Sequence, residues 1–528
     1  MSNGGTYTII TNQSHSSGLL LEPELFKNKI QAWMCKKVST AIDKELVARR
    51  INLDKKTPDE IQAMRNKIGQ EISNKSSDWI PTLHDITSHQ VFVDSTFKPS
   101  ISVGSEYQKI APNGGTAASL GNKIIFTIAN SGEFIQDMVL NLKLNGLIAN
   151  NAADKVRYVE MLGHRLLKTC TFKVASNIID TYTPEIANIH YQFHVPQHKE
   201  EGYLRMIGQE IPNVGFITAD PTTDEVRKYV TYGSGPQTFK YNQGTLELFI
   251  PLRFWTSDIR TALPNYLLRS GSVTIEIEFE SDTNLIAYAN YSGTTGPVYT
   301  APTVRDCVLY VNNIYVHPDV KRILPKHHTE QLIRVHRYQK FSGVVSATNK
   351  IVLNGIQWPV EQLFVGFQPS DNSTDSRKWH RQSYLTTVSP KEAVVTGVAT
   401  IQVNTAAYYT ESPIVASATI RAEDTTLFPI ATTPFFNQYM PYQYGDAHKT
   451  PKDQGWLLFN FSRYPDKFDP SGHFDATSTR EIALDYTSAV NSSSVNYITT
   501  GTPCTITVVA VCRNLLICKD NSAILRYS

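Results

Sequence analysis

The chain has 528 residues, of which 41% are hydrophobic and 19% charged, and its formal net charge is +2. This composition excludes a disordered chain, and the length exceeds the roughly 250–300 residues at which a single hydrophobic core stops growing. A nearly neutral chain also gives no electrostatic reason to expect specific nucleic-acid binding, because nucleic-acid binders concentrate basic side chains on one face. The sequence therefore predicts at least two folded domains.

The first eighty residues have helical spacing. Apolar residues recur every three or four positions from Leu25 to Leu46, and a second helix is predicted at Thr57, where Pro58 suits the first helical position and Glu60 completes a capping box. No signal peptide or membrane span is expected, because no basic and apolar leader and no window of 18 uncharged apolar residues occurs. We expect a helical arm over residues 1–85 that packs on the protein, with a basic helix on a membrane surface as the alternative.

Beyond the arm the hydrophobic period changes from 3.6 to 2. Apolar and polar residues alternate over 273–280 (VTIEIEFE), and apolar residues recur at every second position in 140–144, 246–254 and 482–486. Such alternation predicts antiparallel strands with one buried face, and long loops such as 281–303 separate them. Helical signal is sparse, with 183–193 and 359–363 as the best short candidates. The pattern favours antiparallel β-sandwiches.

One stretch of the sequence occurs twice in altered form. NKIIFTIANSGEFIQDMV (122–139) returns as NKIVLNGIQWPVEQLFV (349–365). LELFIPLRFW (246–255) and the strand after it find their counterparts in GWLLFNFSRY (455–464) and the strand at 480–486. Three features in the same order predict a domain duplication, with the division in 317–325, where two prolines bracket a charged stretch. We expect one β-domain over 86–320 and another over 321–528.

No group of residues has the spacing of a catalytic site, since GxSxG, phosphate-binding and HExxH motifs are absent from the sequence. His190, His194 and His198 lie four apart, as zinc ligands on a helix would, but Pro196 interrupts them, so we interpret them as partly exposed surface histidines. The six cysteines form no CxxC pair and are interpreted as buried thiols. We expect no enzyme, cofactor or metal; a lectin-like or receptor-binding module and a β-sandwich enzyme are the alternatives.

Two further segments have more than one interpretation. The basic run 321–340 is interpreted as a solvated linker or subunit contact, with an acidic partner such as nucleic acid or lipid headgroups as the alternative. The aromatic segment FFNQYMPY (435–442) fits either a lectin-like site or an interface between subunits, where Tyr, Phe and Met are enriched. We favour the interface.

Short segments in a fixed order carry a family resemblance from about residue 97 to the C-terminus. They include FKPSISVGSEYQKI (97–110), LGNKIIFTI (120–128), GQE (208–210), GPQT (235–238), LRFW (252–255), WPVEQLFVGFQP (358–369), KWH (378–380) and PSGH (470–473). In these segments the chain resembles the major capsid proteins of nucleocytoplasmic large DNA viruses. The motif positions, to which we assign a structural role, are Phe97, Lys98, Pro99, Gly121, Asn122, Lys123, Gly208, Gln209, Glu210, Gly235, Pro236, Gln237, Arg253, Phe254, Trp255, Trp358, Pro359, Trp379, His380, Pro470, Ser471, Gly472 and His473.

This resemblance implies a double jelly roll, that is, two eight-stranded antiparallel sandwiches in tandem behind a helical N-terminal arm. It further implies a homotrimer whose six jelly rolls form a pseudo-hexagonal capsomer, with capsomers tiling an icosahedral virion shell assembled in a cytoplasmic viral factory. The implied partners are other copies of the chain, neighbouring capsomers, minor capsid and penton proteins and, through the arm, an inner membrane. The helical stretch at 24–75 is longer than the usual arm of the family.

Overall fold

The protein is described from a computed structural model. It covers residues 42–44, 46, 57–75, 103–115, 118–129, 132–211, 213–218, 226–231, 235–293, 295–316, 330–344, 348–388, 408–429, 431–445, 447–465, 467–489, 502–519 and 521–527. The chain divides into two compact units, residues 1–104 with 316–320 and residues 105–315 with 321–528.

The first unit contains one long described helix, α4 (Pro58–Lys75). It begins as predicted, because the backbone N–H of Thr57 donates to Glu60 Oε2 at 3.1 Å, which is one half of a capping box. Most of the helix predicted over 25–46 lies outside the described residues. None of the described helices is both long and apolar enough to cross a membrane.

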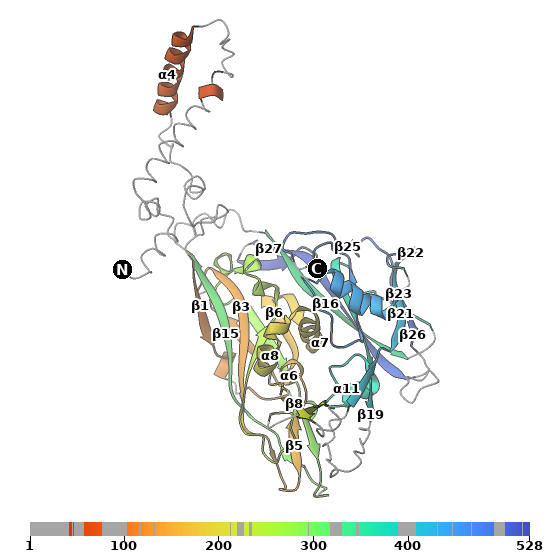
Figure 1. The fold of residues 1–528 in the computed structure, drawn as a ribbon. Helices are drawn as coiled ribbons and strands as arrows, with labels where there is room; N and C mark the ends of the chain where they lie inside the picture. Colours follow the sequence, from red (N-terminus) through yellow and green to blue (C-terminus); the bar gives the residue numbers. More distant parts are fainter. Residues whose placement is uncertain are drawn as a thin grey trace. The chain divides into compact units, whose positions relative to one another are not determined.

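Residues 103–316, nearly all of which belong to the second unit, form an antiparallel sandwich, called roll 1 (Figure 1). One sheet has the order β1 (Val103–Ile110), β15 (Val304–Val316), β3 (Phe134–Leu144), β10 (Leu246–Leu252), and β11 (Leu263–Pro264) also pairs with β3. The other has the order β2 (Lys123–Ile128), β12 (Val273–Phe279), β6 (Leu167–Val174), β7 (Asn177–Tyr182). The alternation read from the sequence is confirmed, since every second residue of β12 is buried.

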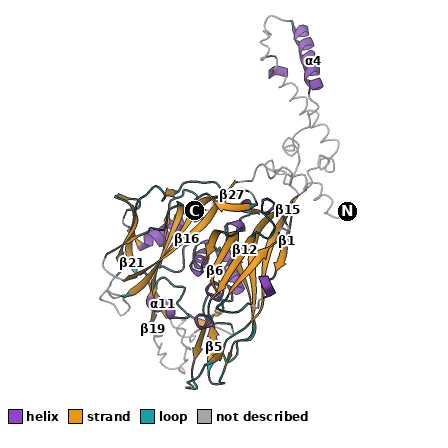
Figure 2. Ribbon diagram, turned by 180° about the vertical axis from the view of Figure 1, so that it is seen from behind, coloured by secondary structure: helices purple, strands orange, loops and turns teal. Residues whose placement is uncertain are grey.

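Residues 330–527 form a second sandwich, roll 2. Its first sheet has the order β16 (Glu330–Val344), β27 (Pro503–Lys519), β18 (Pro359–Pro369), β24 (Trp456–Asn460), with β25 (Phe474–Asp475) on β18 and β28 (Ser522–Leu525) on β27. The second has the order β17 (Asn349–Val352), β26 (Ile482–Ser488), β21 (Val415–Ala422), β22 (Thr425–Thr426), with β23 (Ala431–Thr432) on β21. Strands dominate both rolls in Figure 2.

The two rolls repeat one topology strand by strand. Residues 122–139 form β2 and β3, and the similar segment 349–365 forms β17 and β18. In roll 1, β2 pairs with β12, and in roll 2, β17 pairs with the equivalent strand β26. Leu248 lies opposite Leu142 in roll 1, as Leu457 lies opposite Val365 in roll 2. The duplication predicted from the sequence is therefore present in the strand order, and the fold is a double jelly roll.

Short elements occupy the connections between the strands. In roll 1 these are β4 (Ile148–Ala149), β5 (Lys155–Tyr158), α6 (Leu162–Leu166), α7 (Pro184–Ile189), η3 (His190–His194), α8 (Gln197–Met206), β8 (Asn213–Thr218), β9 (Val226–Thr231), η4 (Trp255–Ser257), η5 (Ile259–Thr261), η6 (Asn265–Leu267), α9 (Asp282–Leu285), β13 (Ile286–Ala289) and β14 (Tyr299–Thr300). In roll 2 they are α11 (Ser370–Thr374), β19 (Tyr384–Val388), β20 (Tyr408–Ser412), η8 (Phe435–Tyr439) and α12 (Met440–Gln443). The predicted helix over 183–193 is confirmed as α7 and η3. The predicted helix over 359–363 is wrong, because these residues begin the central strand β18.

Buried side chains of both rolls form one continuous hydrophobic cluster, which includes Phe126 and Phe172 of roll 1 and Phe364 and Trp456 of roll 2. The five cysteines in the described part of the chain are free and buried, as predicted, and burial raises the pKa of Cys512 to about 12. Cys35 lies outside the described residues.

A buried carboxylate joins three neighbouring strands of roll 2. Glu361 on β18 is 1% exposed, and Arg334 Nε on β16 donates to its Oε2 at 2.6 Å. Nε of Arg513 on β27 lies 2.7 Å from the other oxygen. Both guanidinium groups also donate to backbone carbonyls at 467–468. The described part of the basic run 321–340 therefore belongs to strand β16 and is not a solvated linker. Its Arg334 is held by the buried carboxylate of Glu361.

We expect Glu361→Gln to lower the free energy of unfolding by about 3–5 kcal/mol, because it leaves two largely buried guanidinium groups without a counter-charge. Urea denaturation measures this loss. The matched control is Glu481→Gln, which removes an exposed carboxylate paired with Lys350 of β17 and should change stability little. Equal effects of the two substitutions would contradict the structural role of Glu361.

A second prediction concerns His164, which is buried in α6 with its Nε2 2.7 Å from Tyr203 Oη. Burial lowers its pKa to about 3. Between that value and the ordinary histidine pKa near 6.5, the unfolded chain binds a proton that the folded chain does not, so stability falls as pH falls through this window. The slope contributed is about 1.4 kcal/mol per pH unit. Unfolding measured between pH 6.5 and 5 should show a smaller slope for His164→Gln, and an unchanged slope would contradict a neutral buried imidazole.

Candidate functional site

The two rolls meet along a seam, which we define as β7 and residues 183–206 of roll 1 against β16, β18 and the loops 370–383 and 447–455 of roll 2. At its centre the buried carboxylate of Asp180 on β7 accepts hydrogen bonds from the backbone N–H of His336 on β16 and from its Nδ1, both at 3.0 Å. Nearby, Lys340 Nζ donates to Glu185 Oε1 at 2.6 Å. Charged groups that the sequence separates widely thus couple the edge strands of the two rolls.

The segment formed by α7 and η3 inserts side chains and carbonyls into roll 2. Asn188 Nδ2 donates to the His380 carbonyl at 2.7 Å, and the backbone N–H of Lys449 donates to the Phe193 carbonyl at 2.7 Å. The Phe193 ring packs against Phe364 of β18, with centroids 5.0 Å apart. The helices of roll 1 lie between the two sandwiches in Figure 1. This segment therefore contributes both apolar packing and directional hydrogen bonds to the seam.

A second attachment involves Trp379 of the KWH segment. Its Nε1 donates to the Glu160 carbonyl of roll 1 at 2.5 Å, and the Arg165 guanidinium lies 5.1 Å from its ring centroid. Arg157 Nη2 donates to Ser376 Oγ at 2.7 Å. Roll 1 thus contacts this roll 2 loop at two positions, Ser376 and Trp379.

All three spaced histidines are at least partly exposed, as interpreted, but two of them lie in the seam and not on an outer surface. His190 and His194 stack at 5.6 Å inside the seam, and the His194 ring lies 5.0 Å from His448 of roll 2. Burial lowers the pKa of His194 to about 4 and that of His190 well below its usual range, whereas His198 is exposed. The reason is tertiary, because roll 2 covers the helix face that carries the first two. Among the described residues no His, Cys, Asp or Glu group could hold a metal ion.

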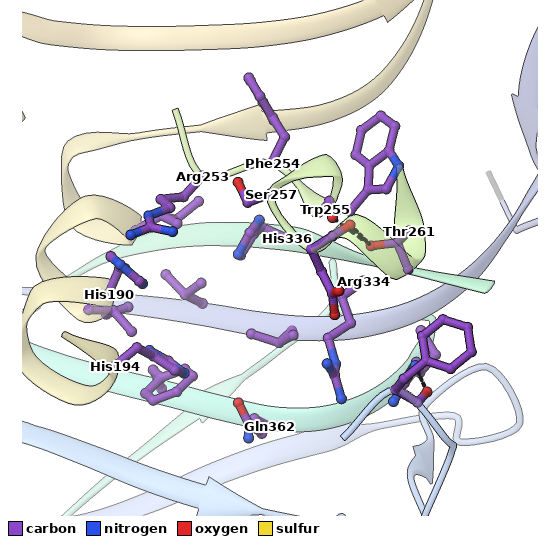
Figure 3. Close-up of a pocket in the computed structure, with 18 of the residues that line it drawn as sticks. His190, His194, Arg253, Phe254, Trp255, Ser257, Thr261, Arg334, His336 and Gln362 are labelled. Carbon is purple, nitrogen blue, oxygen red and sulfur yellow. Dashed lines mark hydrogen bonds between the residues drawn. The ribbon is translucent and has the colours of Figure 1, made fainter. Parts of the chain in front are cut away.

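A cavity of about 370 Å³ opens in the seam (Figure 3). From roll 1 its wall includes His190, His194, Arg253, Phe254, Trp255, Ser257, Asp258 and Thr261, and from roll 2 it includes Arg334, His336, Gln362, Phe364, Phe468 and Arg513. Arg253, Phe254 and Trp255 belong to the LRFW segment, where β10 ends and η4 begins. The charged residues of this wall are three arginines and one carboxylate, Asp258.

Two motif segments far apart in the sequence form one hydrogen-bonded cluster. Gln237 Nε2 donates to the Gly208 carbonyl at 2.9 Å, and its Oε1 accepts from the backbone N–H of Glu210 at 2.6 Å. Glu210 Oε1 in turn accepts from the backbone N–H of Gly235 at 2.9 Å. Gly208 has φ +77°, which L side chains rarely adopt. The GQE and GPQT segments therefore fix the long loop between β7 and β10.

The other motif positions are distributed over the two rolls. Lys123 pairs with Glu276, Arg337 stacks 3.3 Å from the Trp358 ring centroid, and Ser471 Oγ lies 2.7 Å from Ser462 Oγ. Gly121 and Gly472 have positive φ values. Gly121, Asn122, Pro236, Pro359, Pro470, Gly472 and His473 lie at turns or strand ends. Phe97, Lys98 and Pro99 lie outside the described residues.

Sequence reasoning missed Asp180, Glu361 and His336, the polar residues at the centre of the contacts. The available signal was a charged residue inside an apolar run, as in VEQLFVGF around Glu361. In the aromatic segment 435–442, Phe436 is buried, whereas Tyr439 is 50% and Tyr442 78% exposed. The segment thus both anchors its loop and presents two aromatic rings to the outside of the chain.

Comparisons with known proteins agree with this architecture. Residues 107–317 match the family described as major capsid protein N-terminus, and residues 322–528 match the large eukaryotic DNA virus major capsid protein family. The hexon protein p72 of African swine fever virus (isolate Tick/Malawi/Lil 20-1/1983) is 24% identical, with 85% of this chain and 93% of that protein covered. The major capsid protein of Phaeocystis pouchetii virus is 24% identical over 48% of this chain and 50% of its own length.

Among solved structures, the Faustovirus major capsid protein superposes with a TM-score of 0.69 at 24% identity, covering 96% of this chain and all of that one. A PBCV-1 virus capsid structure gives a TM-score of 0.59 at 17% identity over 83% of this chain and 100% of its own. These structures support the fold, and the two family matches together span most of the sequence. The chain belongs to the major capsid proteins of nucleocytoplasmic large DNA viruses, and it is a structural protein of the virion capsid and not an enzyme.

Proposed function

We propose that this chain assembles as a homotrimer whose six jelly rolls form a pseudo-hexagonal capsomer, and that these capsomers tile an icosahedral shell. The observation that carries the proposal is the strand-by-strand repeat of one sandwich topology within a single chain. Three chains with two similar domains each present six similar edges, which suits a capsomer that has six neighbours in a lattice. Closed symmetric homo-oligomers are also the usual form of soluble assemblies.

The seam supports this proposal because a tiling subunit needs a fixed angle between its two rolls. Asp180 and Glu185 of roll 1 contact His336 and Lys340 of roll 2, and the core is continuous across both rolls. The two rolls would then act as one rigid body during assembly. The exposed rings of Tyr439 and Tyr442 are proposed as contacts between subunits, since Tyr is enriched at interfaces.

We further propose three parts of the chain with different tasks. Residues 1–85 form the arm, residues 86–320 the first jelly roll and residues 321–528 the second. The arm would contact minor capsid proteins and the inner membrane, while the rolls contact neighbouring capsomers and penton proteins. Assembly would take place in a cytoplasmic viral factory of the host.

A purified preparation should have a mass of about three times the 59.2 kDa of one chain. Light scattering coupled to size exclusion measures this mass, and negative-stain images should show particles with a hexagonal outline. We expect obligate interfaces larger than roughly 2,000 Å², so the trimer should persist on dilution. A stable monomer would contradict the proposal.

Deletion of residues 1–85 should leave the trimer mass unchanged but reduce shell assembly. The physical reason is that the described strands of the two rolls all lie after residue 102, so the deletion removes none of them. Expression with the other capsid components, followed by electron microscopy, measures assembly. Loss of the trimer on deletion would instead place the arm within the capsomer core.

A further inference from the structure

Arg253 has a charge that no described group neutralises. It follows the last residue of β10 and lines the seam cavity, with its guanidinium beside His190 in Figure 3. Its Nε is buried without a hydrogen-bond partner, and no carboxylate of the described residues forms an ion pair with it. Buried polar atoms of proteins are nearly always hydrogen-bonded, so a buried Nε without a protein partner is available as a donor to a ligand.

Three carboxylates near the cavity already have cationic or imidazole partners. Asp258 pairs with Arg260, with 2.6 Å between Oδ2 and Nη2, and Asp180 accepts from His336. Glu361 is shared by two arginines, Arg334 and Arg513. Of the charged side chains that line the cavity itself, three are arginines, Arg253, Arg334 and Arg513, and one, Asp258, is a carboxylate.

The cavity also has uncharged hydrogen-bond donors and enough volume for a ligand of several atoms. His190 Nε2 is buried without a partner, and Ser257 adds a hydroxyl to the same wall. The positive charge of Arg253 adds to the effect of burial in lowering the pKa of His190, which agrees with their proximity. A volume of about 370 Å³ exceeds the roughly 30 Å³ that one water occupies in the liquid, so a multi-atom ligand fits.

We propose that the seam cavity binds an oxyanion of the phosphate class, with Arg253 as its principal ligand and His190 and Ser257 as further donors. A guanidinium presents planar paired N–H groups that match the oxygens of phosphate, and such charge-assisted hydrogen bonds are stronger than neutral ones. The bound anion would pair with Arg253 and bridge the two rolls, because the cavity wall comes from both. The proposal does not depend on the trimer.

Isothermal titration calorimetry of the full-length protein with inorganic phosphate tests this site, and sodium chloride at equal ionic strength is the reference. We expect saturable binding with one site per chain. A parallel titration with a nucleoside triphosphate distinguishes free phosphate from a nucleotide phosphate, since the true source should bind more tightly. Arg253→Gln should weaken binding about tenfold or more, because a hydrogen bond to a charged group is lost.

The matched control is Arg205→Gln, which removes an exposed arginine paired with Glu201 on α8 and should leave phosphate binding unchanged. If Arg253→Gln does not fold, Gln362→Glu is the second variant. It is nearly isosteric, lies in the cavity wall and adds a negative charge that should likewise weaken phosphate binding. Absence of saturable binding to the wild type, equal binding of chloride, or undiminished binding in the cavity variants would overturn the proposal.

Discussion

The hydrogen bonds between Asp180 and His336 fix one edge strand of each roll to the other. A carboxylate that loses its water on folding needs replacement donors, and here the backbone N–H and the ring of one residue supply both. Because these donors belong to a strand of the other roll, the relative orientation of the rolls depends on them. The apolar contact of Phe193 with Phe364 and the loop attachment at Trp379 add packing to this directional constraint.

Most of the fold could be predicted from the sequence because alternation records burial directly. Residues 273–279 alternate between a buried and a more accessible face, and the matching alternation of apolar and polar residues in the sequence predicts the strand. The echo of 122–139 in 349–365 revealed the duplication, since equivalent strands have equivalent neighbours. Prediction failed at 359–363, where Glu361 and Gln362 interrupt the apolar pattern. Arginines on the neighbouring strand β27 and on β16 beyond it satisfy Glu361, and no local signal reveals partners that distant.

The seam could not be predicted for the same physical reason. His190 and His194 have the spacing of a helix face, but whether that face meets water or protein depends on roll 2. Likewise GQE and GPQT could be recognised as segments, whereas their mutual hydrogen bonds follow from the path of the loop between β7 and β10. Sequence patterns report the environment of one element well. They report contacts between domains only where a charged or aromatic residue stands out from its surroundings.

The strand order has a consequence for synthesis on the ribosome. In each roll the strand made last among the main ones, β15 or β27, lies between two strands made much earlier. Until residue 316 emerges, β1 has no partner, and until residue 519 emerges, β16 and β18 lack the strand that separates them. Roll 1 can close while roll 2 is still being translated, since domains generally fold as units in order of emergence. A chain truncated before residue 503 thus lacks β27, and the first sheet of roll 2 stays open between β16 and β18.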